Sequence, residues 1–269
     1  LETVEGIDWN LKTKMGIRNN RYVVDVPTVT AKPKRSRPVH RDEAAFCRAH
    51  TQKRLKWTLP GPMTICDTLA DGHYGRRADM AMAFAEILNE EALELEAAGC
   101  DVIQFDEPAF NVFMEDVKDW GIAALDRAAR GLKCATAVHI CYGYGIEANI
   151  QWKQTLGSEW RQYEEIFPAI NASAIGQVSL ECANSRVPVS LIGLLPDKQL
   201  LVGAIDVATD RIETPEQVAS VIAEALKHAD AERIQPCTNC GLAPLSRAVA
   251  EGKLAALGAG AALARKRHG

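Results

Sequence analysis

The stretch Asp101-Val-Ile-Gln-Phe-Asp-Glu-Pro108 decides the fold, because a short strand-like segment runs directly into two carboxylates. Upstream of it, residues 78–98 carry apolar side chains at three- and four-residue spacing, which predicts a helix. Gly99 then stands where a left-handed C-terminal cap is wanted. Downstream, residues 113–131 predict another helix. The quoted stretch is therefore a strand between two helices.

The same alternation continues along the chain. Further strands are predicted at 55–59, 135–140, 177–180, 200–205 and 233–236, and further helices at 158–169, after Thr214, and at 243–264. Thr214 as N-cap, Pro215 at the first position and Gln217 form a capping box. Strands that alternate with helices imply a parallel sheet.

The placement of polar residues favours a barrel over an open doubly wound sheet. Asp106, Glu107, His139, Cys141, Glu181, Asp206 and Cys240 all fall at or just after the C-terminal ends of predicted strands. A (β/α)8 TIM barrel builds its active site at that rim. An open sheet remains an alternative, but the first strand is not followed by a Gly-rich nucleotide loop. We therefore predict an α/β fold of the (β/α)8 type.

Only six βα units can be counted, whereas the barrel needs eight. We predict that residues 1–53 form an irregular or β-hairpin excursion belonging to the barrel, in which 21–30 can pair, and that 54–269 form the catalytic barrel. The first two βα units are then missing from this chain, which begins at Leu1 rather than Met. Two units correspond to roughly 70 residues, at about 35 each.

Composition excludes several classes of function. A net charge of -4 argues against a nucleic-acid-binding surface, and the basic residues between Lys32 and Arg37 lie among prolines and indicate a solvated loop. The chain has neither an apolar run of membrane-spanning length nor a secretory signal. Eight scattered cysteines are typical of reduced thiols, so we predict a cytoplasmic protein without nucleic-acid or membrane partners.

The strongest group of chemical residues is His139-x-Cys141, followed by Glu181 and Cys240. Residues i and i+2 of a strand face the same side, so His139 and Cys141 can meet at one ion. Zinc prefers thiolate and imidazole ligands with an occasional carboxylate. From spacing alone, a zinc site and a packed histidine among inert cysteines both remain open.

Several motifs resemble the catalytic barrel of the cobalamin-independent methionine synthases. They are Gly61-Pro-Met-Thr64, Gln104-Phe-Asp-Glu-Pro108, His139-Ile-Cys-Tyr142, Ser179-Leu-Glu181 with Ser185-Arg186, and Asn239-Cys-Gly241, in the family's order from about residue 54 onward. The resemblance implies that His139, Cys141, Glu181 and Cys240 bind zinc, and that Asp106 binds the amino group of homocysteine. In the family only the cysteine before glycine is a ligand, which selects Cys240 over Cys237.

Two other carboxylates are candidates for supporting roles. Glu107 follows Asp106 directly and is predicted to support substrate binding. Asp206 ends the Gly203-Ala-Ile-Asp run, where the family also has an aspartate, and is predicted to act in catalysis by orienting a ligand or substrate. Cys182 should face the opposite side of its strand from Glu181 and be buried. Tyr142, Tyr144, His73 and Tyr74 are candidates for lining the mouth.

The resemblance implies that the chain makes methionine from homocysteine. Zinc fits this reaction, because it deprotonates a bound thiol and makes the sulfur nucleophilic. We expect the donor to be 5-methyltetrahydrofolate or a methyl group delivered by a partner protein. A folate donor needs an acid for its leaving nitrogen. The long family members carry a histidine two residues after the aspartate, where this chain has Ala208, and they have a folate-stacking tryptophan that is absent from Ile65-Cys-Asp-Thr68. A methylcobamide, which needs no such acid, is therefore the alternative donor.

Two other classes of protein compete with this assignment. A zinc-stabilised binding module without catalysis would unfold when the metal is removed. A decarboxylase of the uroporphyrinogen type would need cationic side chains for its carboxylates rather than a cluster of thiols.

Overall fold

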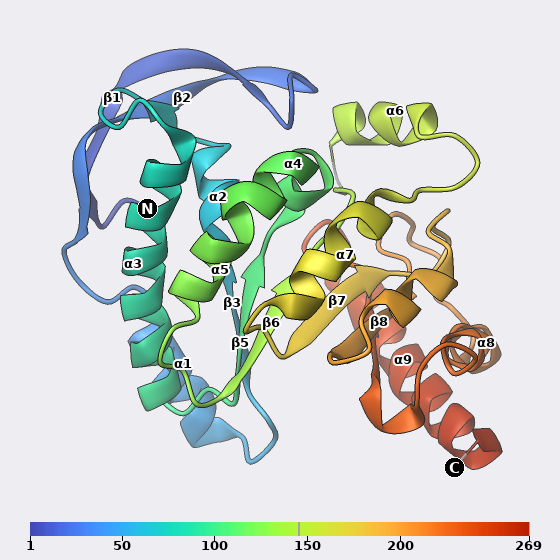
Figure 1. Ribbon diagram of the computed structural model, residues 1–269. Helices are drawn as coiled ribbons and strands as arrows, with labels where there is room; N and C mark the ends of the chain where they lie inside the picture. The colour runs from blue at the N-terminus through green and yellow to red at the C-terminus, as the bar shows by residue number, and fades with distance from the viewer. Residues whose placement is uncertain (145, 269) are drawn as a thin grey trace. The chain divides into compact units, whose positions relative to one another are not determined.

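The structure, a computed structural model, describes residues 1–144 and 146–268 (Figure 1). Two compact units are present. Unit 1 comprises Leu1–His139 with Ala172–Gly176, and unit 2 comprises Ile140–Asn171 with the residues from Gln177 onward.

Unit 1 contains three parallel strands, β3 (Lys56–Pro60), β5 (Val102–Asp106) and β6 (Ala135–His139). β5 lies between the other two, with Phe105 paired to Leu59 and Val138. α2 (Pro62–Cys66) and α3 (Arg77–Ala97) connect β3 to β5, and α3 agrees with the predicted helix. The stretch 101–108 therefore contains the central strand of this group, β5.

The helix predicted over 113–131 is confirmed over residues 114–128, where it contains a π-helical turn. After η1 (Pro108–Asn111), the structure has α4 (Met114–Asp116), the π-helical η2 (Val117–Gly121) and α5 (Ile122–Ala128). A Cβ at Gly121 would lie 3.2 Å from Met63 Sδ, so the glycine allows this irregular turn to approach α2 closely.

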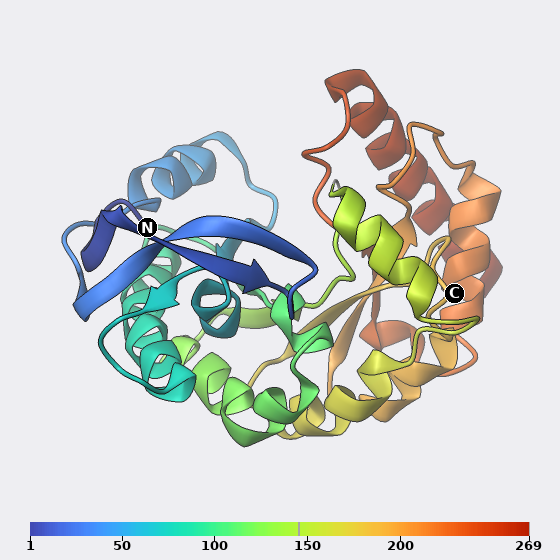
Figure 2. The same cartoon turned by 90° about the horizontal axis from the view of Figure 1, so that it is seen from above.

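The first residues form the predicted hairpin, which is longer than residues 21–30. β1 (Val4–Ile17) and β2 (Tyr22–Arg35) pair antiparallel, and the short β4 (Ala70–Asp71) joins β2. This hairpin, drawn in blue in Figure 2, is bonded to the rest of unit 1. Arg18 N–H donates to Asp67 Oδ2 at 3.0 Å, and Arg35 forms an ion pair with Glu91 at 2.7 Å. α1 (Arg41–His50) follows the hairpin, in a segment for which no helix was predicted.

Unit 2 contains the parallel strands β7 (Gln177–Glu181), β8 (Gln199–Ile205) and β9 (Ile234–Thr238). α8 (Pro215–Ala225) connects β8 to β9, and α9 (Arg247–His268) follows β9. The predicted capping box is confirmed, because Gln217 N–H donates to Thr214 Oγ1 and Thr214 N–H donates to the Gln217 side chain at 2.9 Å.

α8 and α9 lie side by side (Figures 1 and 2). They pack together and against β8 through a cluster that includes Ile205, Val218 and Ala264. Gly260 makes this contact close, since a Cβ there would lie 2.4 Å from Val218 Cβ and 2.9 Å from Pro215 O. α9 begins at Arg247, a few residues later than predicted.

The other elements of unit 2 are α6 (Glu147–Thr155), α7 (Gln162–Ala172), η3 (Val189–Leu194) and η4 (Ala231–Arg233). The helix predicted over 158–169 corresponds to α7, shifted toward the C-terminus. α6 was not predicted, because its apolar residues Ala148, Ile150 and Trp152 are two positions apart and do not follow the three- and four-residue spacing of a helix.

Parallel strands that alternate with helices define a TIM-barrel-like α/β fold, as predicted from the sequence. Six parallel strands occur among the described residues, and the expectation of two further units stays a prediction. A search of the described helices finds none with the length and apolar character needed to cross a membrane.

Candidate metal centre and substrate pocket

Three of the four predicted metal ligands converge. His139 is the last residue of β6, Cys141 follows two residues later, and Cys240 lies two residues beyond the end of β9. One ligand atom from each lies within 4.8 Å of the other two. His139 and Cys141 are buried and Cys240 is half-buried. One imidazole and two thiols at this spacing are a donor set that suits zinc.

The electrostatics of these residues also fit a cation. The pKa of Cys141 is raised well above its ordinary value by its hydrogen bond with Cys240, by burial, and by the negative charges of Cys240 and Glu181. Two thiolates and a carboxylate cannot all carry charge in a buried site without a compensating positive charge. A bound divalent cation would provide that charge and deprotonate both thiols.

Glu181, the fourth predicted ligand, is fully buried at the end of β7. Its carboxylate accepts hydrogen bonds from Tyr142 N–H at 2.6 Å and from the Tyr144 hydroxyl at 2.8 Å. It is close enough to raise the pKa of Cys141, but it is not one of the three groups within 4.8 Å. Its role as a ligand stays a prediction.

Asn239 is a structural residue that the sequence reasoning missed, although it belongs to the quoted Asn-Cys-Gly motif. This fully buried side chain donates to Ala183 O at 2.7 Å and to the Tyr144 hydroxyl at 3.2 Å, and it accepts from the backbone N–H groups of Cys182 and Ala183. Because Asn239 directly precedes Cys240, these bonds connect the Cys240 loop to the segment after β7.

A second group of predicted residues lies in unit 1. Asp106 ends β5, is half-buried, and accepts a hydrogen bond from Gln104 at 2.9 Å. Glu107 is fully buried and accepts from Met63 N–H at 2.9 Å, from Thr64 N–H at 2.8 Å and from the Thr64 hydroxyl at 2.7 Å. Glu107 thus binds the N-terminus of α2, a position that favours a negative charge.

Burial is the largest influence on Glu107 and raises its pKa to about 7, against the lowering effect of the hydrogen bonds from Thr64 and Met63. Gly61 leaves room for this carboxyl group, because a Cβ there would lie 2.1 Å from Glu107 Cδ. The geometry gives Glu107 a supporting position directly after Asp106. Substrate binding by these two residues stays a prediction.

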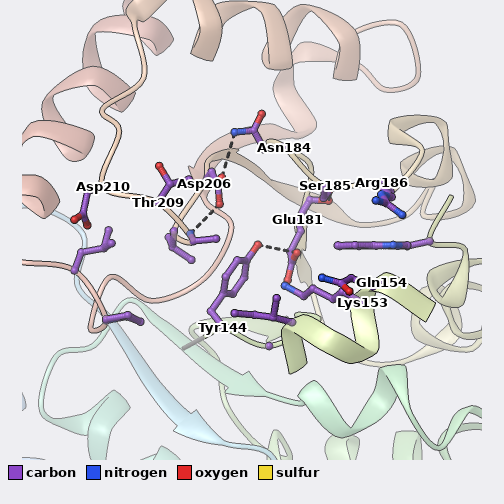
Figure 3. Close-up of a pocket in the computed structure, with 17 residues that line it drawn as sticks. Tyr144, Lys153, Gln154, Glu181, Asn184, Ser185, Arg186, Asp206, Thr209 and Asp210 are labelled. Carbon is purple, nitrogen blue, oxygen red and sulfur yellow. Dashed lines mark hydrogen bonds between the residues drawn. The ribbon is translucent and has the colours of Figure 1, made fainter. Parts of the chain in front are cut away.

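Asp206 lies at the edge of a pocket of about 600 Å³ in unit 2 (Figure 3). It follows β8, and its carboxylate accepts from Asn184 at 3.1 Å and from Ala208 N–H at 2.8 Å. The pocket is of the size typical for small-molecule sites. Its wall combines the cationic side chains of Lys153 and Arg186 with acidic ones.

The remaining candidates have different environments. Tyr144 lines the pocket, whereas Tyr142 is buried and donates to Gln162. His73 and Tyr74 contact each other edge-to-face in unit 1. Cys182 is buried, as predicted, and burial raises its pKa. Cys237 lies with its Sγ 3.9 Å from Ser179 Oγ and is not in the His139 group.

A TIM-barrel-like fold with an imidazole and two thiols gathered at its strand ends defines a protein with a candidate transition-metal centre. Residues 2–262 match the family described as "Cobalamin-independent synthase, Catalytic domain". The chain belongs to this family of cobalamin-independent methionine synthases.

Curated relatives carry the same assignment. The methionine synthase of Saccharolobus solfataricus is 30% identical over 89% of this chain and 68% of its own length. That of Sulfolobus acidocaldarius is 32% identical over 85% of this chain and 62% of its own length. The chain thus spans roughly two thirds of the length of these relatives.

Solved structures agree. A B12-independent methionine synthase from Shewanella sp. W3-18-1, in complex with selenomethionine, is 57% identical and superposes with a TM-score of 0.95 over 99% of this chain and 78% of that chain. A Listeria monocytogenes structure described as a vitamin-B12-independent methionine synthase is 17% identical, covers all of this chain and 77% of that chain, and has a TM-score of 0.68. The second match supports the fold alone.

Proposed function

We propose that this chain is a zinc-dependent homocysteine S-methyltransferase that forms methionine. The observation that carries the proposal is the convergence of His139, Cys141 and Cys240 within 4.8 Å. Membership of the methionine synthase family supports the reaction. The selenomethionine bound to the Shewanella protein is an analogue of the expected product and supports methionine as the ligand.

In this proposal His139, Cys141 and Cys240 hold the zinc ion, and Glu181 is the fourth ligand. Bound zinc would lower the pKa of the homocysteine thiol, so that the substrate sulfur is present as a nucleophilic thiolate at neutral pH. The protein's own residues orient the substrate. Asp106 accepts charge-assisted hydrogen bonds from the amino group of homocysteine, and Glu107 keeps the adjacent α2 in place.

The methyl donor is 5-methyltetrahydrofolate or a methyl group delivered by a partner protein. A second candidate, a methylcobamide, is favoured by one observation. Ala208 lines the pocket beside Asp206 and has no group that could protonate a folate nitrogen. A corrinoid donor needs no such acid, because its leaving group is the reduced cobalt centre.

Metal analysis together with methionine formation tests the proposal. The purified wild type should contain about one zinc per chain, and Cys240→Ser should lose the metal and slow methionine formation by at least about 100-fold, more than the loss of an outer partner of a ligand costs. Cys134→Ser is the control, because Cys134 is half-buried and outside the cluster. A Cys240→Ser variant with full zinc and full rate would refute the assignment.

The same assay separates the donors. Homocysteine is incubated with 5-methyltetrahydrofolate in one reaction and with methylcobalamin in the other. Methionine formed from the folate alone would exclude the corrinoid, and methionine formed only from methylcobalamin would establish it.

A further inference from the structure

A lysine lies completely buried in unit 2, outside the proposed set of catalytic and metal-binding residues. Lys253 of α9 has no exposed surface, and its Nζ donates to Asp206 O at 2.8 Å, to Arg211 O at 2.6 Å, and to the Glu213 carboxylate at 3.0 and 3.2 Å. All three ammonium protons therefore have acceptors. Lys253 is paired with Glu213 and bound to two backbone carbonyls of one segment.

Glu213 completes this arrangement from the acidic side. Its Oε1 accepts the backbone N–H of Asp206 at 3.0 Å, and its side chain is buried. The Lys253–Glu213 pair therefore binds both polar groups of the Asp206 backbone, the N–H and the carbonyl. The Asp206 carboxylate is fixed separately by Asn184 and Ala208 N–H.

The segment held in this way is a wall of the pocket. Residues 206–210 all line it, and Figure 3 labels Asp206, Thr209 and Asp210 among them. The pair binds the segment at Asp206 and again at Arg211. α9 runs close to the end of this segment, since a Cβ at Gly252 would lie 2.4 Å from Ile212 Cδ1.

A buried ion pair is a poor means of gaining stability, because the cost of removing both charges from water offsets their attraction. As far as the two charges alone are concerned, apolar residues of similar volume are often no worse for stability. The lysine and glutamate do what apolar residues cannot, which is to bind the backbone of Asp206 at defined points.

We infer that Lys253 and Glu213 are positioning residues for methyl transfer, which fix Asp206 and the 206–211 wall of the pocket. The inference rests on the proposed function. It predicts that loss of the pair impairs turnover although the protein remains folded.

The test is the double variant Lys253→Met/Glu213→Leu, which removes both charges together and leaves neither unpaired. The matched control is Arg35→Met/Glu91→Leu in unit 1. Arg35 and Glu91 are also a buried ion pair, and Glu91 also accepts from backbone N–H groups, those of Val39 and His40. Among the described residues, none of these four lines the pocket.

Both double variants should unfold cooperatively. In the Lys253/Glu213 variant, amide hydrogen exchange should accelerate at least tenfold across residues 206–211, and kcat should fall at least tenfold with a smaller change in KM for homocysteine. In the control variant, the exchange rate over residues 206–211 and kcat should both match the wild type. If the test variant does not fold, Glu213→Gln, which preserves shape, is compared in the same way.

Wild-type kcat in the test variant would overturn the inference, whether or not exchange accelerates. A reduced kcat with unchanged exchange would also overturn it, because the segment would then not depend on the pair. Methionine formation by the wild type is measured first. If the wild type makes none from either donor, the proposed function fails, and the exchange measurement still decides whether the pair holds the segment.

Discussion

Replacing Glu107 by glutamine should remove a specific pH dependence of stability. Burial raises the folded pKa of Glu107 to about 7, whereas its ordinary value is 4.5. Between these values the folded protein keeps the proton and the unfolded chain has released it. The stability contributed by this raised pKa is therefore complete below about pH 4.5 and is lost as the pH rises to about 7. Glutamine does not titrate, so its variant lacks this contribution at every pH.

The magnitude follows from the difference between the two pKa values. A shift from 4.5 to about 7 is about 2.5 units, and at about 1.36 kcal/mol per unit this gives about 3 kcal/mol. The glutamine variant also carries a cost of about 1–3 kcal/mol, because its amide NH₂ must face the N–H of Met63 or of Thr64. That cost does not change with pH, so only the first quantity appears in a pH series.

Urea unfolding of both proteins between pH 4.5 and 7.5 measures the effect. The free energy of unfolding of the wild type, minus that of Glu107→Gln, should fall by about 3 kcal/mol over this range. Thr64→Val provides a second check, because loss of the hydroxyl bond at 2.7 Å should raise the pKa of Glu107 further and extend the slope above pH 7. A difference that is the same at every pH would refute the reasoning.

Three further predictions concern the site and the helices of unit 2. Asn239→Ala should destabilise the protein by about 2–4 kcal/mol, because the buried hydrogen bonds of Asn239 to Ala183 and Tyr144 are lost. Urea unfolding measures this loss, and a value below about 0.5 kcal/mol, typical of a neutral surface substitution, would contradict the prediction. Removal of zinc by a chelator should abolish methionine formation while circular dichroism still shows the fold, whereas unfolding would indicate the zinc-stabilised module. Thr214→Ala should cost about 1 kcal/mol through loss of the capping box with Gln217, and Thr214→Ser should restore most of it in thermal unfolding.

The sequence allowed the positions of the site residues to be predicted because their placement depends on local features. β5, β6 and β7 were recognisable from short apolar runs, and within unit 1 parallel pairing brings the C-terminal ends of β5 and β6 to one edge. His139 and Cys141 could be assigned to one site because two-residue spacing in an extended chain is independent of the rest of the fold. The capping box of α8 was predicted for the same reason.

The parts that escaped prediction depend on contacts distant in sequence. α6 lacks the apolar spacing of a helix, and the π-helical turn before α5 reflects the close approach of Gly121 to Met63. The partners of Glu181 are a backbone N–H and a tyrosine hydroxyl some forty residues upstream, which no local pattern encodes. Lys253 gave no signal either, because a lysine in a helix normally indicates an exposed face.

The close contact at Gly260 has a consequence for how mutations spread through unit 2. Even a methyl group at this position would collide with the carbonyl of Pro215, and main-chain atoms cannot rotate aside as a side chain can. α9 itself would have to shift. Lys253 lies about two turns earlier on that helix, so its ammonium group would be carried along. An alanine at position 260 would thus lower the melting temperature through overpacking and, through the displaced Lys253, also reduce turnover.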